Sequence, residues 1–174
     1  MEQQPDERRE ILKDGSEVLI RPIRPADAGT HASFITKLSA PSKHYLFLGG
    51  VARMSDAALE QLCSPDGAHD MAYVAIAPDG GGREIGISRY AGANPEQGAE
   101  ISIAVADDWQ HRGLGRRLLE RLIEHARARG VTRLYSIDAL DNDRMRSLAH
   151  HLGFAERPDP DDLHQVVYYL ELAS

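Results

Sequence analysis

Two glycines and several arginines occur together in residues 107–119, which read DDWQHRGLGRRLL, at the start of an amphipathic stretch. Gly113 and Gly115 remove side chains where the chain turns, so backbone N–H groups can approach a ligand closely. The first turn of a following helix leaves further N–H groups unpaired, and such a helix start binds anions. Arg112 and Arg116 lie at this end, although a cation near a helix N-terminus is ordinarily unfavourable by about 0.3–1 kcal/mol. The segment therefore predicts a binding site for a phosphate-bearing cofactor.

The spacing of these glycines excludes two common phosphate loops. A P-loop requires Lys-Ser or Lys-Thr after the last glycine, and neither pair follows Gly115. The dinucleotide fingerprint G-x-G-x-x-G requires a third glycine at the position that Leu118 occupies. The remaining pattern is Gln110-x-x-Gly113-x-Gly115, which a plain structural turn would also fit. Its interpretation therefore depends on the residues around it.

The pattern resembles the Q/R-x-x-G-x-G/A motif of the GNAT N-acetyltransferase superfamily. In that family the loop amides hold the pyrophosphate of acetyl-CoA, and the backbone of the preceding strand pairs with the pantetheine amides. One N–H of that strand can also polarise the thioester carbonyl. The resemblance thus implies a set of residues that bind acetyl-CoA, with Arg112 and Arg116 as ion-pairing side chains. This set is Ile103, Ala104, Val105, Gln110, His111, Arg112, Gly113, Leu114, Gly115, Arg116 and Asn142.

Asn142 belongs to this set because of a second motif. The sequence Asn142-x-x-Met145-x-x-Leu148, followed by a Gly-Phe pair, resembles the N-x-x-(A/M)…G-F segment of the superfamily, in which the asparagine contacts the cofactor arm. The simpler interpretation is that Asn142 enters a helix beside an Asp141 cap. The sequence departs from the superfamily pattern at Ala149, where many relatives carry a tyrosine that acts as general acid. Two alternatives stay open: the CoA thiolate leaves without a dedicated side-chain donor, or a neighbour supplies the proton, with Ser147, His150 and Tyr135 as weak candidates.

Acetyl transfer to an amine needs a base, because a lysine-like amine of pKa ~10.4 is uncharged about once in a few thousand molecules at pH 7. Glu100 lies in a predicted strand, where glutamate is under-represented, and shares a face with the small residues Ser102 and Ala104. Alternation alone favours an ordinary half-exposed carboxylate. The resemblance implies a general base, because Glu100 precedes Gln110 by ten residues, as does the base in the histone-type and protein-lysine acetyltransferases.

The rest of the chain predicts the elements that position these residues. Alternating apolar residues predict strands over 18–23, 71–77, 84–91, 100–106, 133–140 and 164–172. Helical periodicity predicts helices over 27–38, 56–63, 114–129 and 141–152. This order indicates an α/β (α+β) protein with a mixed, mostly antiparallel sheet of 6–7 strands flanked by about four helices, which is the GNAT fold. In that fold the strands before and after the glycine loop and its helix splay apart.

The chain of 174 residues is expected to form a flexible N-terminal arm at 1–10 and a single domain at 11–174. An apolar loop at 42–53 is expected to pack inward or line a pocket. With the connections 91–99 and 158–162, this loop would set the specificity for the acceptor.

The composition limits which classes of partner, compartment and metal site this chain is expected to have. A net charge of −7 and a pI of ≈ 5.6 argue against general nucleic-acid binding. The single cysteine, Cys63, fits a reducing compartment. No apolar run approaches the ~18 residues of a membrane span, and the polar start does not resemble a signal peptide. The histidines lack ligand spacing, so no metal site is predicted. We expect a cytoplasmic protein.

A wider resemblance suggests the acceptor. Residues 12–172 resemble the catalytic domain of bacterial Pat-type protein lysine acetyltransferases, which acetylate lysines, notably in acyl-CoA synthetases. The matching segments are DGS at 14–16, IRPIRPAD at 20–27, LS at 38–39, Tyr45, DDWQ at 107–110 and LGF at 152–154. We therefore expect acetyl-CoA-dependent acetylation of a protein lysine, with a small amine as the second choice. A non-catalytic acyl-CoA sensor and phosphate-ester binding without acyl chemistry stay open.

Overall fold

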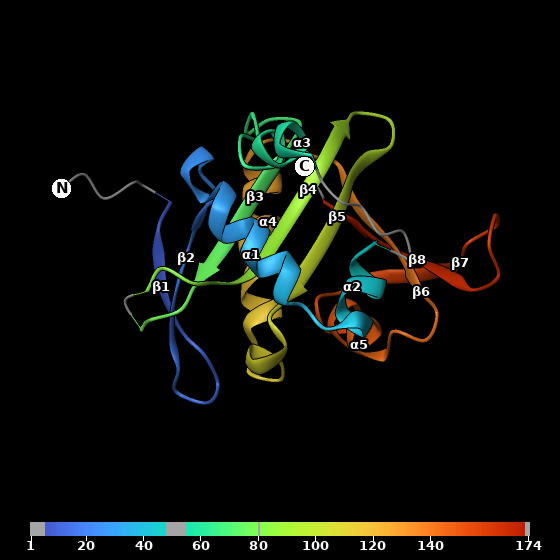
Figure 1. Cartoon of the computed structure of the whole chain (residues 1–174). Coiled ribbons are helices and arrows are strands. Elements are labelled where there is room, and N and C mark those ends of the chain that lie inside the picture. The colour runs from blue at the N-terminus through green and yellow to red at the C-terminus, as the bar shows by residue number, and fades with distance from the viewer. Residues whose placement is uncertain (1–5, 48–54, 80, 173–174) are drawn as a thin grey trace.

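The computed structural model describes residues 6–47, 55–79 and 81–172 (Figure 1). In these parts the chain forms one eight-stranded sheet, with the strand order β1-β2-β3-β4-β5-β6-β8-β7, and five α-helices. The strands are β1 (Arg8–Ile11), β2 (Glu17–Pro22), β3 (Met71–Ile76), β4 (Glu84–Asn94), β5 (Gly98–Val105), β6 (Arg133–Ala139), β7 (Ala155–Pro158) and β8 (Gln165–Glu171). The helices are α1 (Ala28–Lys37), α2 (Ala40–Phe47), α3 (Asp56–Leu62), α4 (Leu114–Ala128) and α5 (Asp143–His151), with short 3-10 turns at Pro25–Asp27 and Asp107–Trp109.

The sheet is antiparallel except between β5 and β6, which run parallel. In Figure 1, α1 and α3 lie in front of the sheet, and α4 lies behind it. A parallel pair needs a long crossover, and α4 provides it between β5 and β6. This arrangement confirms the expected mixed, mostly antiparallel fold.

The element count exceeds the expected one at three places. Strands β1 and β7 are four residues long, lie at the two edges of the sheet and have no buried side chain, so apolar alternation could not reveal them. Residues 8–10, expected in a flexible arm, belong to β1. Helix α2 begins at Ala40, contains Pro41 in its first turn and covers 42–47, where the sequence predicted a loop. Proline is tolerated in a first helical turn because its missing N–H would be unpaired there anyway. The rest of the expected 42–53 loop, 48–53, lies outside the described residues.

Helix α4 packs its apolar stripe on the rear face of the sheet. Leu118, Leu119 and Leu122 are fully buried, and Leu114 is nearly so. The hydroxyl of Ser88 in β4 donates a hydrogen bond of 2.9 Å to the Leu118 carbonyl oxygen. Burial of leucine side chains contributes about 1.5–3 kcal/mol each. The start of α4 is therefore held firmly against the ends of β4 and β5.

The two parallel strands separate soon after they meet. Their pairing covers two positions, Ala99 with Leu134 and Glu100 with Tyr135. Strand β5 then follows β4 as far as Val105, and β6 follows β8 along its whole length. Figure 1 shows β5 and β6 diverging toward the end of the molecule where α4 begins. The expected splay is therefore present, and it opens a gap beside the glycine loop.

Within the described residues, no helix combines the length and apolar character needed to cross a membrane. The same residues contain no group of three or more His, Cys, Asp or Glu side chains that could hold a metal ion.

Candidate functional site

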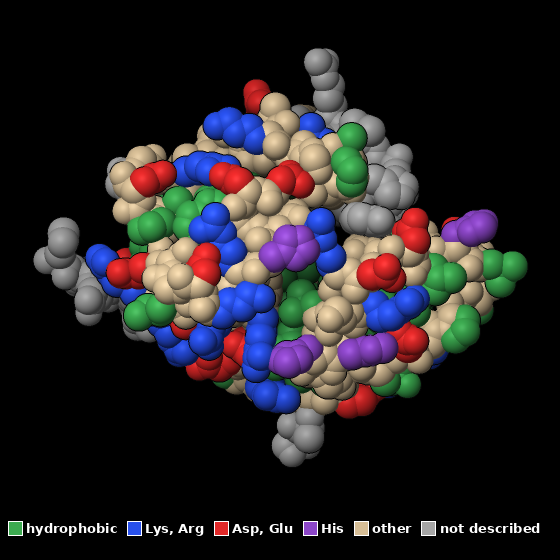
Figure 2. Space-filling model, turned by 90° about the horizontal axis from the view of Figure 1, so that it is seen from below, with side chains coloured by type: hydrophobic (Ala, Val, Ile, Leu, Met, Phe, Trp, Pro, Cys, Tyr) green, Lys and Arg blue, Asp and Glu red, His purple; other side chains and the backbone are tan. Residues whose placement is uncertain are grey.

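A pocket of ≈ 580 Å³ lies between the diverging strands and the starts of α4 and α5. This volume is in the range of small-molecule sites. Figure 2 looks onto this end of the molecule and shows a hollow with hydrophobic side chains at its floor and Lys, Arg and His side chains at its rim. Every residue of the expected cofactor-binding set except Arg112 lines the pocket. The lining also includes Lys13, Ser42, Trp109, Asp138, Asp143, Arg144, Met145, Ser147, Leu148 and His151.

Two residues of the glycine loop that line the pocket, His111 and Gly113, have left-handed backbone conformations. Gly113, the N-cap of α4, has a φ of 86°, and His111 has a φ of 64°. A non-glycine residue in this region costs about 1–2 kcal/mol, and such strain gathers at functional sites. The Arg117 N–H bonds back to the Gly113 carbonyl oxygen at 3.3 Å, so the three preceding N–H groups of the first turn are left for a ligand. The geometry is that of an anion site at a helix N-terminus.

Hydrogen bonds from two other parts of the chain fix this loop. The Asp107 carboxylate accepts bonds from the Ser39 N–H at 2.9 Å and from the hydroxyls of Ser39 and Ser42 at 2.8 and 2.9 Å. Burial would raise the pKa of Asp107, but these bonds outweigh it and lower the pKa. The Gln110 side-chain amide donates to the Val105 carbonyl oxygen at 3.1 Å. Gln110 thereby ties the loop to the end of β5.

The two arginines expected to bind pyrophosphate lie in different places. Arg116 lines the pocket, where it pairs with Glu120 at 2.8 Å and contacts the His151 ring. The guanidinium carbon of Arg112 lies over the Trp109 ring, 4.4 Å from the ring centroid. Its guanidinium also donates to the Ser16 hydroxyl at 3.3 Å and to the Asp108 carbonyl oxygen at 3.0 Å. Arg112 therefore braces the loop from outside the pocket, whereas Arg116 is placed to meet an anion.

Asn142 marks the opposite wall of the pocket. Its side-chain oxygen accepts a hydrogen bond of 3.2 Å from the Met145 N–H, so Asn142 itself is the N-cap of α5, where the sequence suggested Asp141. The cap uses the amide oxygen. A contact with a cofactor arm would therefore come from the Nδ2 donor.

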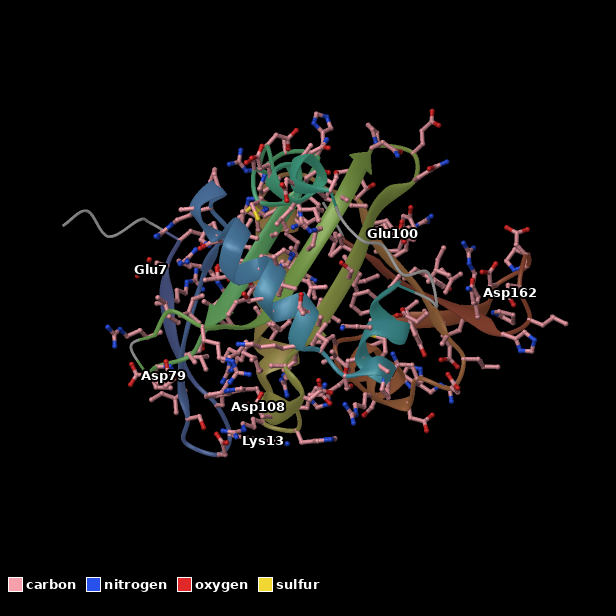
Figure 3. The ribbon with its side chains drawn as sticks, viewed as in Figure 1. Glu7, Lys13, Asp79, Glu100, Asp108 and Asp162 are labelled. Atoms are coloured by element: carbon pink, nitrogen blue, oxygen red, sulfur yellow. The ribbon has the colours of Figure 1, made fainter. Side chains whose placement is uncertain are left out.

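Glu100 lies away from the pocket lining, near the start of β5. It is exposed on the face that carries α1 and α3, next to Ala91 of β4 and Tyr135 of β6. Figure 3 places it far from Lys13 and Asp108, which mark the end of the molecule with the glycine loop. Val105 comes five positions after Glu100 in β5, about 17 Å of extended chain. An extended cofactor arm could bridge this separation along the gap.

Lys13 and Asp138 are among the pocket residues that sequence reasoning missed. Lys13 comes from the turn between β1 and β2, which carried no sign of function. Asp138, in β6, reads as part of an ordinary strand. Burial raises the pKa of Asp138 to about 6, and the charge of Glu100 adds to the rise. A carboxylate in a strand otherwise rich in apolar residues was the signal that could have revealed it.

The two loop glycines predict opposite results for alanine substitution. Gly113→Ala should cost about 1–2 kcal/mol, as lost stability and lost CoA affinity together, because its φ of 86° disfavours a side chain. Gly115→Ala should keep its stability, since its added Cβ would meet Ile103 and Leu148 at 3.5 Å, an ordinary contact. Thermal unfolding and calorimetric titration with CoA measure the two effects. Equal losses of stability in both variants would contradict this picture of the loop.

Comparison with known proteins adds independent information. The model of the Acetyltransferase (GNAT) family matches residues 48–154. A Pseudomonas aeruginosa protein named Acetyltransferase PA5475 is 43% identical over 164 residues, which cover 94% of this chain and 88% of that protein. The L-methionine sulfoximine/L-methionine sulfone acetyltransferase of Pseudomonas paraeruginosa is 34% identical over 85 residues, 47% of this chain and 49% of that protein.

A solved structure shows the same architecture. The crystal structure of the GNAT domain of S. lividans PAT matches this chain with a TM-score of 0.85 and 26% identity. The match covers 95% of this chain and 97% of that one. The likeness therefore extends over nearly the whole chain.

Proposed function

The chain belongs to the Acetyltransferase (GNAT) family, and we propose that it transfers the acetyl group of acetyl-CoA to the side-chain amine of a protein lysine. Acetyl transfer itself follows from the family. The observation that supports the choice of acceptor is the full-length likeness to the GNAT domain of S. lividans PAT. It agrees with the resemblance of residues 12–172 to Pat-type lysine acetyltransferases.

In this proposal the pocket is the acetyl-CoA site. The N–H groups of Leu114, Gly115 and Arg116 bind the pyrophosphate at the positive end of α4, and the Arg116 side chain adds a cation. The backbone of β5 that faces the gap, Ile103 to Val105, has no β6 partner there and offers its N–H and C=O groups to the pantetheine amides. The apolar floor beside Leu148 accommodates the arm.

Glu100 is the proposed general base. It lies where β5 and β6 still pair, at the narrow end of the gap between them, and its carboxylate is exposed on the face of the sheet that carries α1 and α3. An ammonium group can approach there from solvent, and a carboxylate both attracts it and removes its proton. The uncharged nitrogen can then attack the thioester carbonyl, whose developing charge a β5 N–H stabilises.

A small amine is the second candidate acceptor. It is favoured by the 34% identity over 85 residues to the Pseudomonas paraeruginosa enzyme, whose named substrates are small amino acids. The same base and the same donor would serve both acceptors. The choice between a protein lysine and a small amine would depend on the residues that surround Glu100.

Thiol release in the presence of acetyl-CoA tests the proposal. We expect release with an acyl-CoA synthetase as acceptor, together with an acetylated lysine found by mass spectrometry, at least about tenfold faster than with L-methionine sulfone at equal concentration. The reverse order of rates would favour the small amine. CoA binding without thiol release from any acceptor would indicate a sensor and overturn the proposed reaction.

A further inference from the structure

Asp138 lies across the gap from the strand that is proposed to bind the cofactor arm. The parallel register pairs Glu100 with Tyr135, so three residues further along, Ile103 and Asp138 are level on the two sides of the gap. Both residues line the pocket, together with Asn142. Asp138 is therefore the carboxyl group of β6 that a ligand in the gap would meet.

The surroundings of this carboxyl favour its uncharged form. Asp138 is half-buried, and within the described residues its one hydrogen bond from a side chain comes from the Ser136 hydroxyl on the same strand. Burial raises the pKa of Asp138 to about 6, although the Ser136 bond opposes the rise. Glu100 contributes to the rise through its negative charge. A pKa of about 6 leaves roughly one Asp138 carboxyl in ten protonated at pH 7.

The reaction needs a proton at the opposite end from the amine. When the C–S bond of the thioester breaks, its electron pair leaves with sulfur, and a thiol has a pKa of ~8.5, so sulfur takes up a proton near neutral pH. Ala149, fully buried in α5, has no group that could supply it. Two carboxyl groups in unlike surroundings commonly divide the roles of base and acid.

We propose that protonated Asp138 gives its proton to the sulfur of CoA as the C–S bond breaks, an inference that rests on the proposed acetyl transfer. The acceptor ammonium first loses one proton through Glu100 to solvent; the uncharged nitrogen then forms the N–C bond and gives a second proton to Glu100. Asp138 is left as a carboxylate, and Glu100 is left protonated. Exchange of one proton through solvent restores both groups, so atoms and charge balance.

Other titratable groups surround this part of the pocket and bear on any pH dependence. Tyr168 of β8 lies on the same side of the sheet, and the charge of Asp138 is among the causes that raise its pKa, after burial. The remaining ones are Glu100 on β5, Tyr135 on β6, His111 in the glycine loop, Arg116 on α4, Asp143, Arg144, Arg146 and His151 on α5, and Lys13 on the β1–β2 turn. Histidine is the residue type that most often changes charge near neutral pH, so His111→Gln and His151→Gln are needed as controls.

Turnover of Asp138→Asn tests the role directly. We expect kcat for thiol release to fall about 10²-fold, with the KM for acetyl-CoA changed by less than about threefold, because general acid catalysis contributes about 10²–10⁴-fold. The wild-type kcat should decline at high pH as Asp138 loses its proton. Asp138→Asn should lack this decline, whereas His111→Gln and His151→Gln should keep it. A variant with wild-type kcat and pH profile would overturn the inference alone, whereas a wild type without amine-dependent thiol release would overturn the proposed function as well.

A titration independent of turnover completes the test. The side-chain carbon of Asp138, followed by NMR in ¹³C-labelled protein, should titrate near pH 6, and saturation with CoA should move the midpoint upward because the ligand excludes water. Ser136→Ala should also move the midpoint upward, since the lost hydrogen bond lowers the pKa, and should shift the decline of kcat in the same direction. A midpoint that neither CoA nor Ser136→Ala moves would overturn the role, even if Asp138→Asn fails to fold.

Discussion

Glu100→Gln lowers kcat/KM for an amine acceptor by about 10²-fold or more if Glu100 is the general base, since this is the usual contribution of a positioned acid or base. The substitution keeps the shape of the side chain and removes its ability to accept a proton. Thiol release measured at pH 7 with saturating acetyl-CoA checks this expectation.

The fold and the donor site should not change in this variant. Glu100 is exposed, so the melting temperature and the stabilisation by CoA should equal those of the wild type. Glu60→Gln is the matched control, because Glu60 is an exposed glutamate of α3. It should keep full activity. Acetylation of an acyl-CoA synthetase by Glu100→Gln at the wild-type rate would remove Glu100 from the mechanism.

The elements that frame the site were predictable because their signals are local. The apolar stripe of α4, with Leu118 and Leu122 fully buried, has the period of a helix packed on a sheet. Gly113 marks the turn before it, and the left-handed φ of 86° is a conformation that glycine adopts freely. Alternation along β5 likewise placed Glu100 on the same face of the sheet as Ser102 and Ala104, and Ile103 on the opposite face. Each of these features depends on neighbours within a few residues.

The features that escaped prediction depend on contacts between distant residues. The Arg112 guanidinium contacts Ser16 from the β1–β2 turn, ninety-six positions away, and this contact draws it out of the pocket. Asp107 holds Ser39 and Ser42 at the start of α2, whose first turn contains Pro41. The separation of β5 from β6 follows from pairing with β4 and β8, which no pattern within β6 records. These long-range contacts decide which charged groups face a ligand.

The remaining large effect is expected at Gly98, where β5 begins. Gly98→Ala should lower the free energy of unfolding by about 3 kcal/mol or more, a value reserved for clear steric or packing faults. Gly98 has a φ of 84°, which costs alanine about 1–2 kcal/mol. In addition, a Cβ there would lie 2.2 Å from the Arg133 carbonyl oxygen, a backbone atom that cannot move alone. Denaturant unfolding measures the loss.

Gly92→Ala separates the two causes. Gly92 also has a positive φ, 66°, but its added Cβ would meet nothing within 4 Å, so this variant should lose about 1–2 kcal/mol. The excess loss in Gly98→Ala then reports the clash with β6. The pairs Ala99–Leu134 and Glu100–Tyr135 come directly after Gly98, so relief of the clash must move β5 against β6 where the two strands still pair. Gly98→Ala should therefore also reduce kcat in the fraction that stays folded, whereas Gly92→Ala should not. Equal effects of the two variants on stability and kcat would show that this pairing of β5 with β6 does not position Glu100.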